Sequence, residues 1–76
     1  MKFLRRGQLD DAIQVMNEVI RNDQNDPRHY RFRAELLRLN GKIDRARKDY
    51  VRMTELDPES AIAFNGLAEV ELHAGN

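Results

Sequence analysis

The sequence predicts an all-α fold of four antiparallel helices, arranged as helix-turn-helix repeats. Apolar residues recur at helical spacing in four segments, and no segment alternates as a strand does. Each segment is followed by glycine or by a polar cluster that contains proline. A shift of 34 residues superposes Gly7 on Gly41 and Gly41 on Gly75, together with five further identical pairs. A fixed period in this range indicates a repeat array.

The first predicted helix covers residues 9–22. Two aspartates lie in its first turn, where the helix dipole favours negative charge. Its apolar residues follow helical spacing: Leu9, Ala12, Ile13, Met16, Val19 and Ile20. Residues 1–6 are expected to be the last turn of an earlier helix or a frayed end, which Gly7 terminates in a left-handed conformation.

The second predicted helix covers residues 27–40. Asp26 is expected to cap it, with Pro27 at the first position, where a missing N–H has no cost. It carries two apolar stripes, which predicts that it is sandwiched between neighbours; one stripe is Tyr30, Ala34 and Leu37, and the other is Phe32, Leu36 and Leu39. Asn40 and Gly41 end the helix.

The third and fourth predicted helices cover residues 43–56 and 60–74. The third carries one apolar face made of Ile43, Ala46, Tyr50 and Met53. Pro58 follows it, and Ser60 is expected to cap the fourth helix. The fourth helix is rich in apolar residues, has no lysine or arginine, and is expected to end at Gly75.

We predict an ion pair between Arg33 and Asp49, on the two helices of the central hairpin. An unpaired buried charge is costly, so each needs a partner if the seam buries it. The residue 34 positions after Arg33 is Leu67, and the residue 34 positions before Asp49 is Val15. The neighbouring repeat units therefore lack both charges.

These residues resemble the tetratricopeptide repeat, whose pattern is W-x2-L-G-x2-Y, then A-x3-F, then P over 34 residues. The sequence matches it with Tyr30, Ala34, Leu37, Gly41, Ala46, Tyr50 and Pro58, and departs from it at Arg33. The resemblance implies a single-domain α-solenoid fragment over residues 1–76. Residues 1–26 would be the second half of a repeat, 27–60 a whole repeat, and 61–76 the first helix of a further one.

The resemblance also implies a protein-interaction scaffold that binds a peptide or a partner helix on the concave face of its first helices. The peptide-binding residues would be Arg28, Arg31, Glu35, Arg38, Asn65 and Glu69. Some relatives clamp a peptide carboxylate there, but Phe32, Ile62 and Gly66 occupy positions where that clamp needs polar groups.

Composition argues against catalysis, and we expect neither enzyme activity, cofactor nor metal. There is no cysteine, and Ser60 has a structural role as a cap. His29 and His73 are far apart in sequence, without an acidic ligand at metal spacing. No targeting or membrane-spanning segment is visible, so we expect a cytoplasmic protein with no membrane partner.

Charge is balanced overall, with 13 basic and 13 acidic residues, but it is unevenly distributed. Residues 28–52 hold nine Lys/Arg against three Asp/Glu, whereas residues 53–76 hold no Lys/Arg and five Asp/Glu. The basic strip 28–52 is either a solvated face or a docking surface for an acidic partner. An RNA-binding helical repeat that uses this strip is the alternative function.

The chain has about two repeat equivalents, whereas such arrays need about three repeats and polar caps for stability. We therefore expect a homo-oligomer, two-fold or head-to-tail, or a part of a longer repeat array. The self-association residues would be Phe3, Leu4, Ile62, Leu67, Val70 and Leu72.

Overall fold

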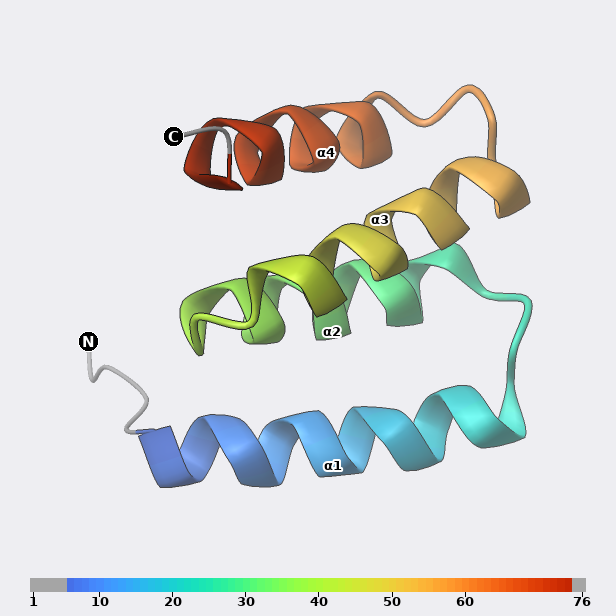
Figure 1. Ribbon diagram of the computed structural model, residues 1–76. Coiled ribbons are helices and arrows are strands. Elements are labelled where there is room, and N and C mark those ends of the chain that lie inside the picture. The colour runs from blue at the N-terminus through green and yellow to red at the C-terminus, as the bar shows by residue number, and fades with distance from the viewer. Residues whose placement is uncertain (1–5, 75–76) are drawn as a thin grey trace.

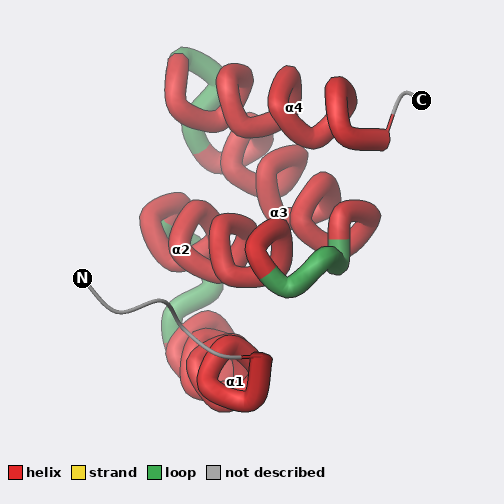
Figure 2. Tube along the Cα trace, turned by 90° about the vertical axis from the view of Figure 1, so that its left-hand side faces the viewer, coloured by secondary structure: helices red, strands yellow, loops and turns green. Residues whose placement is uncertain are grey.

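The computed structural model describes the backbone of residues 6–74 and the side chains of residues 7–72, and this range contains only helices and turns. The helices are α1 (Arg6–Asn22), α2 (Pro27–Leu39), α3 (Ile43–Leu56) and α4 (Ala61–Ala74). Each packs on the next and runs antiparallel to it, so that the four form a stack (Figures 1 and 2). The prediction of an all-α fold with four helices is confirmed.

The ends of α2 show why the boundaries were predictable. The Asp26 carboxylate accepts a hydrogen bond from the Arg28 backbone N–H at 3.0 Å, which caps the start of the helix. At its end, Gly41 has a φ of 78° and donates to the carbonyl of Arg38, while the Lys42 N–H donates to the carbonyl of Leu37. These two bonds form a Schellman motif, which requires the left-handed conformation that glycine adopts without strain.

The prediction for Gly7 is wrong, because this residue lies inside α1 and does not end an earlier helix. Only Gly41 among the described glycines has a positive φ. Glycine accepts a helical as readily as a left-handed conformation, so an in-register glycine does not by itself fix a turn. Gly75 and residues 1–5 lie outside the described residues.

The core is centred on the contact between α2 and α3. Ala34 and Ala46 have no exposed surface, and their small side chains let the two helices approach closely. Around them lie Leu9, Ile13, Ile20, Tyr30, Leu36, Leu37, Tyr50, Met53, Ala63 and Val70. The prediction that α2 is sandwiched between neighbours is confirmed, since it packs on both α1 and α3. Its second stripe is not buried throughout, because Leu36 is buried but Phe32 and Leu39 are exposed.

The predicted ion pair between Arg33 and Asp49 is confirmed. Arg33 donates from Nε and Nη2 to the two Asp49 carboxylate oxygens at 2.8 and 2.7 Å. Its Nη1 also donates to Asn17 Oδ1 at 2.9 Å, so this guanidinium joins α1, α2 and α3. Asp49 is only 4% exposed, and the hydrogen bond to it raises the pKa of Arg33. A bidentate pair of this kind fixes orientation as well as charge balance.

Candidate functional site

A shallow pocket of about 170 Å³ lies between α2 and α4, and α3 forms its floor. This α2/α4 groove is lined by Glu35 and Arg38 from α2, Tyr50 from α3, and Ile62, Asn65, Gly66 and Glu69 from α4. It therefore contains charged and amide groups on its walls and an aromatic ring beneath them. Such a surface suits recognition of a polar chain with one apolar contact, and its lining residues include no serine, threonine, cysteine or histidine.

Ion pairs organise the walls of the α2/α4 groove. Arg38 Nη1 lies 3.2 Å from Glu69 Oε2, which links α2 to α4 across the opening. Arg31 Nε lies 3.3 Å from Glu35 Oε2 along α2. Arg38 Nε is buried and has no hydrogen-bond partner among the described residues. Because a buried donor without a partner is uncommon, this atom marks the least satisfied part of the groove.

The floor of the groove depends on a fit between Tyr50 and Gly66. Tyr50 is buried, which raises the pKa of its hydroxyl, and the nearby Arg38 opposes this shift. A Cβ atom added at Gly66 would lie 2.6 Å from Tyr50 Cζ and closer still to two other ring atoms. The absent side chain therefore lets α4 settle on the ring. The sequence pattern places Gly66 on the peptide-binding face, at a clamp position, but it assigns Tyr50 to the core and so misses it as a groove component.

The structure brings together four of the six residues predicted to bind a peptide, namely Glu35, Arg38, Asn65 and Glu69. Arg31 adjoins them through its contact with Glu35. Arg28 does not join the groove, because its guanidinium is held by the Asp26 carboxylate with an Nη2–Oδ2 distance of 2.6 Å. That pairing lowers the pKa of Asp26 to about 2.

The residues predicted for self-association divide into three groups. Ile62 and Leu72 are exposed, as expected for contact residues. Leu67 is half-buried and Val70 has no exposed surface, because both lie on the side of α4 that packs against the core. The expectation that Val70 lacks a cover is therefore wrong. Phe3 and Leu4 lie outside the described residues.

The surroundings of His29 differ from the sequence-based interpretation. Its Nε2 lies 3.2 Å from an Asp23 carboxylate oxygen and 3.7 Å from one of Asp26. The three ligand atoms lie within 4.8 Å of one another, so acidic groups do stand at metal spacing. Asp26 already accepts hydrogen bonds from the Arg28 backbone and guanidinium, which gives the cluster a role at the start of α2.

The basic strip 28–52 is largely neutralised by acidic neighbours. Six of its nine basic residues form ion pairs with Asp or Glu, namely Arg28, Arg31, Arg33, Arg38, Arg47 and Arg52. For Lys42, Arg45 and Lys48, the described residues provide no ion pair. These three are exposed on one side of α3 and of the turn before it.

Comparison with known families gives one match. A model of the tetratricopeptide repeat matches residues 2–53 and, in a second overlapping placement, residues 33–76. No curated protein and no solved structure matches the chain. Within the described range, every helix is too short or too polar to cross a lipid bilayer.

Proposed function

Because the chain belongs to the tetratricopeptide repeat family, we propose that it is a non-catalytic interaction module whose α2/α4 groove binds a peptide or a partner helix. Repeats of this family generally mediate protein–protein interactions. The observation that carries the proposal is the convergence of Glu35, Arg38, Asn65 and Glu69 over the buried Tyr50 ring. These side chains come from the first helices of successive repeats, where the family presents its binding surface.

The chemistry of the groove favours a partner with an acidic side chain. Such a side chain competes with the half-exposed Glu69 for Arg38, and so replaces one ion pair by another across an interface. An acceptor seated beside Arg38 also gives its Nε a partner that the described chain lacks. Ile62 and Leu72 add exposed apolar surface on the α4 side. A peptide with an acid next to an apolar residue fits this arrangement.

The proposal is tested by selecting peptides from a random display library on the 76-residue chain. The selected peptides are then measured by fluorescence polarisation against variants. Arg38→Gln and Asn65→Ala should weaken binding by roughly tenfold or more, the usual effect of removing a polar contact at the centre of an interface. Arg45→Gln removes an exposed charge outside the groove and is the matched control. Equal binding by all variants, or failure to select any peptide, would refute groove binding.

The described residues support the alternative of RNA binding less well than peptide binding, since Phe32 is the only exposed aromatic residue of the basic strip. The arginines of the basic strip mostly serve internal ion pairs, and Tyr30 and Tyr50, its two tyrosines, are buried and not free to stack on bases. The same polarisation assay distinguishes the two functions, because RNA binding weakens steeply as salt is added.

We also infer that the chain associates through the outer sides of α1 and α4, which no described helix covers. Exposed apolar side chains occur on both helices, including Val15 on α1 and Phe64 on α4. Repeat units of this type bury their apolar faces against neighbouring units.

A further inference from the structure

The two outer helices each carry a partly exposed face, although Ala12, Met16 and Leu67 on these faces also pack against the chain's own core. We define the α1 end face as Ala12, Val15, Met16 and Val19, and the α4 end face as Phe64, Leu67, Ala68 and Glu71. The 34-residue shift relates the α1 end face to Ala46, Asp49, Tyr50 and Met53, and the α4 end face to Tyr30, Arg33, Ala34 and Leu37. Those two related sets lie on α3 and α2, which pack against each other in the chain itself.

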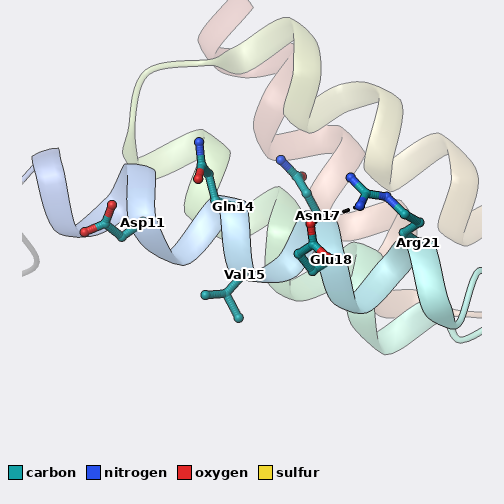
Figure 3. A pocket seen from close by; sticks show the side chains of 6 residues that line it. All are labelled: Asp11, Gln14, Val15, Asn17, Glu18 and Arg21. Carbon is teal, nitrogen blue, oxygen red and sulfur yellow. Dashed lines mark hydrogen bonds and ion pairs between the residues drawn. The ribbon is translucent and has the colours of Figure 1, made fainter.

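The α1 end face is much less covered than its α3 equivalent. All four α3 residues are buried, whereas Val15 is 61% exposed and the other three α1 residues are partly exposed. Figure 3 shows Val15 projecting away from the rest of the molecule, along an open hollow of the α1 surface. The residue types suit burial, but the described chain covers this face only in part.

The α4 end face shows the same contrast. Phe64 is 52% exposed, whereas its equivalent Tyr30 is 7% exposed. Ala68 is exposed, whereas its equivalent Ala34 has no exposed surface. Glu71 would be the one unfavourable member, but its carboxylate turns toward α3 and accepts a hydrogen bond from Arg47 Nε at 2.8 Å. The face therefore offers an aromatic ring and one small residue, Ala68, at the spacing that α2 uses to pack on α3.

Three positions that are polar in the central hairpin and α1 have apolar equivalents on the end faces and on α3. This difference indicates which kind of helix covers the end faces. In the described chain, the polar group Asn17–Arg33–Asp49 joins three successive helices. The residues 34 positions after Asn17 and Arg33 are Val51 and Leu67, which are both apolar. The equivalent of Asp49 beside Leu67 would belong to the helix that packs on α4. The residue of this chain that stands at the equivalent position is Val15, which is apolar as well and exposed.

We propose that the α4 end face packs on the α1 end face of a second copy, in the register with which α2 packs on α3. This inference rests on the proposed self-association and names its partner and its geometry. Leu67 then meets Val15 of the other copy in the place where Arg33 meets Asp49 within the chain. Packing two apolar side chains needs no ion pair, and a single charge placed there would be buried without a partner.

The proposed contact joins two different faces, so it is head-to-tail. In a pair of copies each keeps one free end face, to which a further copy can add. A contact of this type gives an open assembly that grows with concentration, whereas a two-fold contact stops at a dimer.

The experiment uses sedimentation velocity on the 76-residue chain over a wide range of concentrations, with circular dichroism to confirm folding. The wild-type chain should show a mass that rises with concentration beyond that of a dimer. Val15→Asp should weaken association by about a hundredfold, because it leaves an unpaired charge in the contact. Val15 is exposed in the single chain, so this variant should keep its helical content. Leu39→Asp adds the same charge at another exposed position and should associate as the wild type does.

A charge-pair rescue tests the register itself. The double variant Val15→Asp with Leu67→Arg reproduces at every contact the pair that Arg33 and Asp49 make within the chain. It should recover association to within about tenfold of the wild type. A monomeric wild-type chain would refute self-association altogether. Association that Val15→Asp leaves unchanged, or that stops at a dimer, would refute the head-to-tail contact while leaving self-association intact.

Discussion

Replacing Asp49 by alanine removes both acceptors of the bidentate bond from Arg33. The Arg33 side chain is 21% exposed and the Asp49 side chain is 6% exposed, so the remaining guanidinium would be largely withdrawn from water. It would keep only its bond to Asn17. Asp49→Ala therefore leaves a buried charge without compensation, and tests whether the pair is essential to the central hairpin.

The expected loss in the free energy of unfolding follows from the burial of the ion pair. Breaking a fully buried pair costs about 3–5 kcal/mol, and the partial exposure of Arg33 and its remaining bond reduce this to about 2–3 kcal/mol. A domain of this size loses about 4–8 °C in Tm per kcal/mol, so the expected fall is about 10–20 °C. The double variant Arg33→Leu with Asp49→Val carries the side chains of Leu67 and Val15, and should lie within about 1 kcal/mol of the wild type or above it.

The assay is thermal and urea unfolding followed by circular dichroism, at one fixed low protein concentration because association stabilises a folded chain by mass action. Asp49→Asn, which keeps the shape of the side chain, should fall between the wild type and Asp49→Ala. If the double variant were as unstable as Asp49→Ala, the loss would come from packing and not from the stranded charge. A loss below about 1 kcal/mol for Asp49→Ala would show that water still reaches Arg33.

Gly66→Ala should destabilise the chain by about 1–3 kcal/mol in the same urea assay, since the new Cβ atom would overlap the buried Tyr50 ring. Gly7→Ala is its matched control: its Cβ atom meets nothing within 4 Å, and it should stabilise α1 by about 0.5–1 kcal/mol. The Asp26 carboxyl has its pKa lowered to about 2, chiefly by its hydrogen bond from Arg28. Its contribution to stability is therefore complete above about pH 4 and is lost as pH falls toward 2, and Asp26→Asn, which keeps a capping side chain, should differ from the wild type above that window but not below it.

The sequence predicted the fold because the local signals agreed with one another. Asp26 with Pro27 marked the start of α2, and Asn40 with Gly41 marked its end, each through a hydrogen bond that needs only neighbouring residues. The Arg33–Asp49 pair was predictable because the related positions lack both charges together. Gly7 was misjudged because the same residue type permits two backbone conformations.

The site was less predictable than the fold, because helical spacing gives the face of a residue but not its neighbours. Arg28 has the spacing of a groove residue, yet a nearer carboxylate at the helix start holds it. Val70 looked uncovered because the fourth helix is apolar on most sides, and only the packing of α4 on α3 shows which side is buried. Gly66 was placed on the binding face from the sequence, but its close fit to the Tyr50 ring was not foreseen, because a missing side chain has no periodic signal.

The α2/α4 groove and the end faces are linked through the repeat geometry. The groove forms between α2 and α4, which are the first helices of two successive repeats in the proposed division of the chain. If α4 of one copy packs on α1 of the next, the α2 helix of that next copy follows it as the first helix of a further repeat. Each added copy then extends the binding surface, so a long partner would contact several copies and gain affinity by multivalency. Because linkage is reciprocal, such a partner should also promote assembly, and a short peptide confined to one groove should not.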